Sequence, residues 1–319
     1  MRDHVGSELS AVLMNSSLPS DGNPTPSERE EPEGRGQLET FRSLPGDLAP
    51  RDAQDLMVYP FFSLAKSRRV VPIDFRANDV IIRVEGTAEH GIATIWDADI
   101  LIWAASQIVE ARDAGLPTSR LMATTPYEVL LFIRRGTSAR DYVRLKAALD
   151  RLQSTTIATS IRQLSGRRLH RFSWINEWAE RTDSQGRPCG IELVLPDWFY
   201  TGVLNLSLVL TIDREYFRLT GGVARWLYRI VRKHGGRQPS GWRFDVRYLH
   251  LKSGSLAPLA SFAFEVRSIV ARQLLPGYHL TIERSAVGVE TLVFCPVPRP
   301  SIGRIIAELT RSTSIGDKR

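Results

Sequence analysis

Apolar residues recur at helical spacing in the first half of the chain. Ile100, Ala104 and Ile108 share one face of a predicted helix. Asp97 stands where an N-cap is expected, and Gly115 ends the pattern. Similar spacing continues beyond this stretch. It predicts three consecutive helices, over residues 97–115, 125–135 and 138–152.

Short runs of β-branched and apolar residues flank these helices. Residues 70–84 have strand-like composition, and residues 155–161 follow the third helix directly as a strand. The sequence GRR at 166–168 marks a turn, and residues 170–180 continue as the returning strand. The order helix, helix, turn, helix, strand, turn, strand is typical of a winged helix-turn-helix, a three-helix core with a β-hairpin called the wing.

The second half repeats this order of elements. Val223, Leu227 and Ile230 form an apolar stripe, which predicts a helix that ends at Gly235. The elements expected after it are a strand at 242–246, a short helix and turn at 246–254, a third helix at 256–273, and a hairpin of 278–284 with 289–294. The two halves share this order but no obvious sequence identity.

These patterns predict the domain organisation. We expect an α+β fold of two tandem winged helix-turn-helix domains, preceded by a disordered acidic tail. The first 55 residues are rich in Pro, Gly, Ser and Glu, so few of them can enter a core. The predicted segments are the tail 1–55, an N-terminal domain 56–190, a C-terminal domain 191–298 and a C-terminal tail 299–319.

Charge is distributed unevenly along the chain. The whole sequence has 42 basic and 35 acidic residues, a net charge of +7. Residues 1–55 hold 11 acidic and 5 basic residues, a net of −6, which leaves 37 basic and 24 acidic residues, a net of +13, for the rest. A body this basic suits a polyanion, most often nucleic acid, although a solvated basic surface is the simpler alternative.

The third helix of the first half combines an apolar face with a basic one. Leu145, Leu149 and Leu152 fall on the apolar face, whereas Arg140 and Arg144 are four positions apart and project together. In a helix-turn-helix the start of this helix meets base edges, where arginine can bond guanine O6 and N7 in a fork. Taken alone, the two arginines are better explained by an ordinary charged helix face. The adjoining wing favours contact with DNA.

Residues from both halves are predicted to contact DNA. In the first half they are Ser138, Arg140, Asp141, Arg144, Arg167, Arg168 and Arg171, from the start of the third helix and the wing. In the second half they are Lys252, Ser255, Ser261, Arg267 and Arg284, from the turn, the third helix and the hairpin. Phe262 and Phe264, in the same third helix, are expected in the core rather than against thymine.

Motifs of enzymes and metal sites are missing from the sequence. The chain has neither a G-x-x-x-x-G-K-[ST] phosphate loop nor H-E-x-x-H, and its six histidines are isolated. Helix capping explains the two carboxylates of WDAD at 96–99. We therefore expect no catalysis, no cofactor and no metal.

Cysteine usage and hydropathy bear on location. Cys189 and Cys295 have very different neighbours and form no disulfide framework. No apolar run reaches the roughly 18 residues of a membrane span, and the N-terminus lacks the apolar region of a signal peptide. These features predict a reducing, cytoplasmic setting and no membrane contact.

Four motifs carry a resemblance to a known family. MVYPFFSLAKSRR, GIATIWDADILIWAASQI, TGGVARWLYRIVRKHGG and YLHLKSG resemble the replication initiator protein A family of plasmids and secondary replicons in proteobacteria. The resemblance covers about residues 57–297. It implies two winged-helix domains that bind repeated origin sites, called iterons, in double-stranded DNA. It also implies opening of an AT-rich stretch, recruitment of the host initiator and replicative helicase, and a homodimer that acts in autoregulation.

Three other functions share parts of this pattern. A winged-helix transcriptional repressor has the same fold and charge but no role in initiation. A scaffold could use the basic face to bind an acidic protein. An enzyme would show nicking or ATP hydrolysis, for which the sequence offers no motif.

Overall fold

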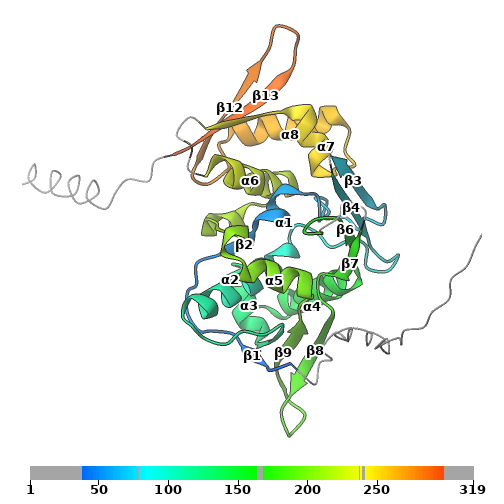
Figure 1. Ribbon diagram of the computed structural model, residues 1–319, viewed down its shortest axis with the longest axis vertical. Helices are drawn as coiled ribbons and strands as arrows, with labels where there is room; N and C mark the ends of the chain where they lie inside the picture. Colours follow the sequence, from blue (N-terminus) through cyan, green and yellow to red (C-terminus); the bar gives the residue numbers. More distant parts are fainter. Residues whose placement is uncertain (1–37, 78, 164–167, 237, 239–240, 298–319) are drawn as a thin grey trace, which may run out of the picture.

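Two units in this chain repeat one order of elements: a helix, a strand, two helices and a hairpin (Figure 1). The computed structural model describes residues 38–77, 79–163, 168–236, 238 and 241–297. Within these ranges the fold is α+β, and no helix is long and apolar enough to cross a membrane. Most of the predicted acidic tail, the predicted C-terminal tail and Arg167 lie outside the described residues.

The first unit contains the three helices that the sequence predicted. Its elements are α2 (Ala98–Asp113), β5 (Leu121–Thr124), α3 (Pro126–Phe132), α4 (Ala139–Ser154), β8 (Glu177–Thr182) and β9 (Pro188–Val194). Strand β9 pairs antiparallel with both β5 and β8. Local sequence sets the start of α3, because Pro126 occupies its first turn and Thr125 forms a capping box with Glu128.

A separate sheet contains the hairpin that the sequence suggested as the first wing. Its strands, in order, are β3 (Ile73–Ala77), β4 (Val80–Glu85), β6 (Thr156–Thr159) and β7 (His170–Ser173). Val84 of β4 faces Ile157 of β6, and both are completely buried, so this apolar pair holds β6 in the separate sheet. The strand predicted over 170–180 is wrong as one element, because it divides into β7 and β8 of different sheets. The hairpin that pairs with β5 is β8–β9.

The second unit has every element that the sequence predicted for it. These are α6 (Gly222–Gly235), β11 (Trp242–Asp245), α7 (Val246–Ser253), α8 (Leu259–Ala271), β12 (Tyr278–Arg284) and β13 (Glu290–Pro296). Strand β13 pairs antiparallel with both β11 and β12. Gly254 ends α7 in the left-handed conformation, with φ of 63°, which lets the chain turn directly into α8.

The segment between the units belongs structurally to the first. Helix α5 (Asp197–Leu204) packs on α2, where the Arg112 guanidinium donates to the carbonyls of Val203 and Leu204 at 3.2 and 3.0 Å. The 3₁₀ helices Leu206–Leu208 and Arg214–Arg218 and strand β10 (Val209–Thr211) then lead to α6. The domain boundary predicted after residue 190 falls inside β9.

Residues 38–55 are part of the folded body, which corrects the prediction of a disordered tail for this stretch. Strand β1 (Phe41–Arg42) pairs parallel with β5, and β2 (Arg51–Ala53) pairs antiparallel with β10. Phe41 and Ala53 are buried in the core. Helix α1 (Gln54–Val58) follows β2 directly and packs against α6. Strand pairing, burial of these apolar residues and hydrogen bonds from the Leu44 and Arg51 N–H groups to side chains of α2 hold this polar stretch in place.

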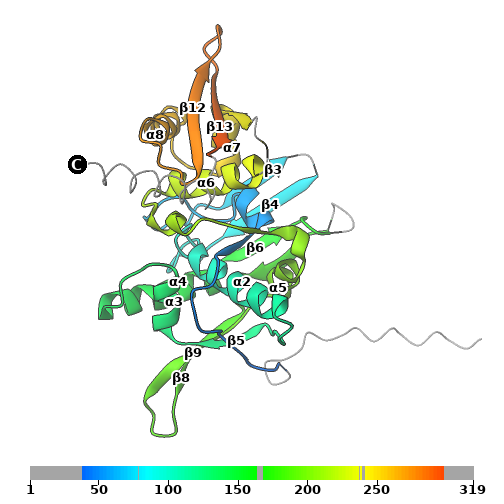
Figure 2. The same cartoon turned by 90° about the vertical axis from the view of Figure 1, so that its left-hand side faces the viewer.

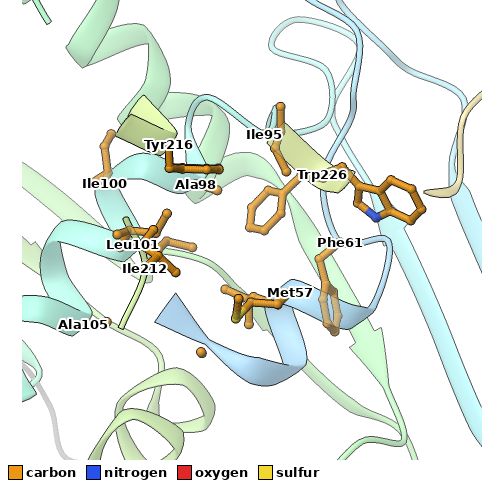
Figure 3. Packing of buried hydrophobic residues seen from close by; sticks show 14 of the residues in the cluster. Met57, Phe61, Ile95, Ala98, Ile100, Leu101, Ala105, Ile212, Tyr216 and Trp226 are labelled. Carbon is orange, nitrogen blue, oxygen red and sulfur yellow. The ribbon is translucent and has the colours of Figure 1, made fainter. Parts of the chain in front are cut away.

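A single core runs through both units. Figure 3 shows Met57 and Phe61, from α1 and the turn after it, grouped with Ile95 of the first unit and Trp226 of α6. All four side chains are buried. Because the same core is shared, the units are held together by packing rather than by a linker alone.

The two hairpins β8–β9 and β12–β13 project from opposite ends of the long axis (Figure 1). In Figure 2, α4 and α8 lie toward the left of the molecule, whereas strands β3 and β4 lie to the right. In Figure 1, α4 lies next to β7 of the separate sheet, and the two elements are in contact.

Candidate nucleic-acid interface

Helix α4 presents a basic face to solvent. Leu145 and Leu149 are buried against the body, whereas Arg140, Val143 and Arg144 are exposed. Arg140 makes no ion pair or side-chain hydrogen bond with another described residue. Arg144 lies 3.5 Å from a carboxylate oxygen of its neighbour at i−3 and remains largely exposed. The guanidinium groups predicted to contact DNA are thus available on one helix face.

Ser138 and Asp141 stabilise the start of α4. The Asp141 carboxylate accepts hydrogen bonds from the Ser138 hydroxyl at 2.6 Å and from the Ser138 backbone N–H at 3.2 Å. The hydrogen bond from the hydroxyl is the main reason that the pKa of Asp141 lies below its usual value. These contacts explain both residues by helix capping, so neither needs a DNA contact to account for its presence.

Asp97 is the N-cap residue of α2, as predicted, but its carboxylate makes no capping hydrogen bond; both carboxylates of WDAD take part in ion pairs instead. Asp97 binds the Arg151 guanidinium through two contacts of 2.7 and 2.8 Å. Asp99 is completely buried and binds Arg225 of α6 at 2.7 Å. Both arginines are therefore structural, and Arg151 is not free to bind a ligand.

The hairpin β8–β9 stands beside α4. The Trp178 indole N–H donates to Asp150 at 3.1 Å, and the Lys146 ammonium binds Glu180 at 2.7 Å. At its tip, Arg187 is 71% exposed and pairs with Asp183 at 2.8 Å. This hairpin was not among the predicted elements, although the run DSQG at 183–186 is a turn signal that marks its tip.

The other predicted wing residues lie on the separate sheet. Arg168 and Arg171 are exposed, at the tip and on strand β7 of the β6–β7 hairpin. Arg167 is outside the described residues. Strand β7 also contacts α4, but its sheet does not include β5, β8 or β9, so Arg168 and Arg171 belong to a different hairpin from the one that pairs with β5.

Helix α8 presents a second exposed face. Ser261 and Arg267 are exposed on it, as predicted for DNA contact. Phe262 is buried against Trp226, with ring centroids 6.1 Å apart. Phe264 is 69% exposed, so the expectation that it belongs to the core is wrong. Two phenylalanines two positions apart point in very different directions on a helix, and only one can face the core.

One carboxylate joins α8 to its hairpin. Glu290 of β13 binds Arg267 of α8 at 2.7 Å and Arg284 of β12 at 2.6 Å. The hydrogen bond from Arg284 is the main cause of the lowered pKa of Glu290. Because the two arginines share one carboxylate, the cluster of Arg267, Arg284 and Glu290 keeps a net positive charge at the edge of the second unit.

Lys252 does not belong to the exposed set. Its side chain is on the inner side of α7, the residue is only 6% exposed, and its Nζ lies 4.9 Å from the ring centroid of Tyr59 and 5.6 Å from that of Tyr248. Burial lowers the pKa of its ammonium. Ser255 is half-buried, and its hydroxyl accepts a hydrogen bond from the Ala257 N–H at 3.2 Å in the turn before α8. Lys252 is withdrawn as a DNA contact, because phosphate cannot reach its covered ammonium.

A basic cleft of about 840 Å³ lies between α4 and the second unit. Its cationic lining includes Lys66, Arg68, Arg134, Arg135 and Arg144. Arg134 pairs with Glu215 and Arg135 with Asp99, each at 3.2 Å. Among the described residues, neither Lys66 nor Arg68 pairs with a carboxylate, so these two exposed cations extend the basic face of α4. Neither residue was among the predicted DNA contacts.

Within the described ranges, no group of three or more His, Cys, Asp or Glu side chains could hold a metal ion. The candidate site is formed by the exposed cations on α4, on α8 and in the cleft between the units, with an exposed hairpin at each end.

This arrangement defines an α+β protein of two similar units that each present a third helix to solvent. The chain belongs to the replication initiator protein A family, whose family model matches residues 51–280. This confirms the resemblance inferred from the sequence motifs. A putative replication protein from Wigglesworthia glossinidia brevipalpis is 32% identical over 228 residues, which are 70% of this chain and 82% of that protein.

Solved structures share the fold. A crystal structure of domains 2 and 3 of RctB has a TM-score of 0.57 at 16% identity and covers 77% of this chain and 99% of that chain. A second crystal structure of RctB domains 2–3 has a TM-score of 0.51 at 15% identity and covers 77% of this chain and 97% of that chain. The likeness extends over both units, so the paired arrangement recurs outside this chain.

Proposed function

We propose that this protein initiates replication of a plasmid or secondary replicon by binding repeated origin sites in double-stranded DNA. The observation that carries the proposal is the repetition of one helix–strand–helix–helix–hairpin unit whose third helices, α4 and α8, both expose cationic side chains. In a chain of the replication initiator protein A family, we interpret both units as winged-helix domains.

The two helices would enter neighbouring major-groove segments. Arg140 and Arg144 on α4, and Ser261 and Arg267 on α8, are the exposed side chains that would meet base edges or phosphates. Lys66 and Arg68 in the cleft would neutralise phosphates between the two helices. For the first unit we place the wing at β8–β9, with Arg187 at its tip. For the second unit the wing is β12–β13, which carries Arg284.

Binding energy alone supplies the mechanism, so we propose no catalytic step, cofactor or metal. Cations release counterions from the phosphates, which makes affinity fall steeply with salt. Copies bound to adjacent repeats would bend and strain the origin, and AT-rich DNA would open where deformation costs least. Host initiator and replicative helicase would then be recruited in the cytoplasm. A homodimer that represses its own gene is part of the same proposal.

A footprint of the purified protein over the DNA upstream of its gene tests this proposal. We expect protection of a repeated sequence, with affinity that falls as salt rises. Replication of a small plasmid that carries the gene and the protected DNA then separates an initiator from a repressor, because a repressor protects DNA without supporting replication. Lack of DNA binding at low salt would favour the scaffold for an acidic protein, and nicking or ATP hydrolysis in the same preparation would favour an enzyme.

A further inference from the structure

Each third helix carries a large apolar side chain that is about two-thirds exposed. On α8 this is Phe264, which is 69% exposed, and on α4 it is Val143, which is 67% exposed. Both lie in the first half of their helices, at the sixth position of α8 and the fifth of α4. Helix α8 also has Leu259, 37% exposed, at its first position. The start of a recognition helix is the part that meets base edges.

The surroundings of Phe264 do not resemble an apolar docking surface. Its neighbours one turn away on the helix are Ala260, Ser261, Arg267 and Ser268. These side chains are small, polar or cationic, and the cation pair around Glu290 borders the same face. The other large exposed apolar side chains nearby are Leu259 at the first position of α8 and Leu256 before it, and neither is one turn from Phe264 on the helix. Val143 has a similar setting, between Arg140 and Lys146.

We propose that Phe264 reads the C5-methyl group of thymine in the major groove, and that Val143 does the same for the first unit. The thymine methyl is the apolar group that the major-groove edge of a base pair offers, and apolar contact with it is a known mode of base readout. Ser261 and Arg267 beside the ring suit the polar base edges and phosphates around such a methyl group. This inference rests on the proposed DNA-binding function and adds the base feature that the helices recognise.

The test replaces thymine by deoxyuridine, which removes only the methyl group. Within the sequence protected in the footprint, each thymine is exchanged singly, and the Kd of full-length protein is measured by fluorescence anisotropy. For wild type we expect about fourfold weaker binding at one or two positions, the effect of one buried methyl-sized group. Phe264→Ala should bind thymine DNA more weakly and lose the dependence at those positions. Val143→Ala should lose the dependence on the thymine methyl group at different positions.

Leu251→Ala is the matched control, because Leu251 is also a large exposed apolar residue of the second unit but lies on α7. It should keep the wild-type deoxyuridine profile. Because Phe264 and Leu251 are both exposed, the thermal unfolding midpoints of these two variants should equal that of wild type.

Two outcomes overturn the inference while the proposed function stands. One is a protected site whose deoxyuridine profile is the same for wild type and Phe264→Ala. The other is a change in oligomeric state of Phe264→Ala, seen by sedimentation, with an unaltered profile, which would assign the ring to a second copy of the chain. Absence of any protected DNA overturns the proposed function and this inference together.

Discussion

Asp52 and Arg229 form a buried two-point ion pair between β2 and α6. The distances are 2.7 Å from Nε to Oδ2 and 2.9 Å from Nη2 to Oδ1, and the two side chains are 2% and 1% exposed. With the Asp99–Arg225 pair, it joins α6 of the second unit to the first. The guanidinium also stacks near Phe62, with its carbon 5.7 Å from the ring centroid.

Asp52→Asn should destabilise the protein by about 3–5 kcal/mol, because it leaves the Arg229 charge buried without a counter-ion. The free energy of unfolding, measured by urea denaturation, tests this. Asp74→Asn is the control, since Asp74 pairs with Arg83 at 3.1 Å on the surface and should cost about 0–1 kcal/mol.

The double variant Asp52→Leu with Arg229→Met sharpens this first prediction. A buried ion pair can often be replaced by apolar residues without loss, so the double variant should recover most of the stability. Equal unfolding midpoints for Asp52→Asn and Asp74→Asn would contradict the buried role of the pair.

Whether a strand pairing could be predicted from the sequence depends on how far apart the two strands are in the chain. The elements of the second unit were predictable because β12 and β13 are joined by a short turn, with Gly288 at φ of 79°. In the first unit the pairing of Leu121 with Val194 joins distant strands, and β6–β7 lies between them in the chain. Periodicity identifies a strand but does not say which distant strand it joins.

The candidate site was partly predictable for a similar reason. Arg140 and Arg144 could be placed on the outward face of α4 from the leucine spacing alone. Phe264 could also have been placed outward by its phase relative to Phe262. Burial of Lys252 could not be foreseen, because Tyr59 comes from a distant part of the sequence.

Glu128 couples the stability of α3 to pH. Partial burial would raise its pKa, but hydrogen bonds from the Thr125 N–H at 3.0 Å, the Thr124 hydroxyl at 2.8 Å and the Ser43 hydroxyl at 3.0 Å lower it overall. A carboxyl whose pKa is lowered on folding stabilises the protein above its unfolded pKa and stops doing so as pH falls through the folded pKa. This stabilisation is therefore present at neutral pH and lost in acid.

Glu128→Gln should lower the free energy of unfolding at pH 7 by about 1 kcal/mol, the usual size of a lost helix cap. The difference from wild type should shrink as the pH falls below the ordinary glutamate value of 4.5. Urea denaturation over a pH series measures both effects. Glu89→Gln is the control, because Glu89 is 83% exposed, and it should show neither effect. A difference that stays constant down to acidic pH would contradict the assignment.

Arg140→Ala and Arg144→Ala distinguish base readout from phosphate contact. If an arginine forks a guanine, its loss should weaken binding to the protected sequence by about 1–3 kcal/mol and leave binding to random DNA nearly unchanged. Competition binding at fixed salt measures the two affinities. Arg83→Ala controls for general loss of charge, since Arg83 is exposed but paired with Asp74 and Glu85. Equal losses on both DNAs would assign the arginine to a phosphate.

Substitutions of Arg187 and Arg171 test which hairpin of the first unit contacts DNA. Lys146–Glu180 and Trp178–Asp150 hold β8–β9 beside α4, so a duplex on α4 would be within reach of Arg187 at the hairpin tip. Arg187→Ala should weaken binding to specific and random DNA alike and reduce the slope of log affinity against log salt by about 1.

Arg171→Ala is its matched comparison, because Arg171 is also an exposed arginine on a hairpin strand but belongs to the sheet of β3, β4, β6 and β7. Its salt slope should equal that of wild type. A reduced slope for Arg171→Ala together with an unchanged slope for Arg187→Ala would assign DNA contact to β6–β7. That result would mean that the hairpin pairing with β5 has another role, and that the duplex crosses the first unit over the separate sheet.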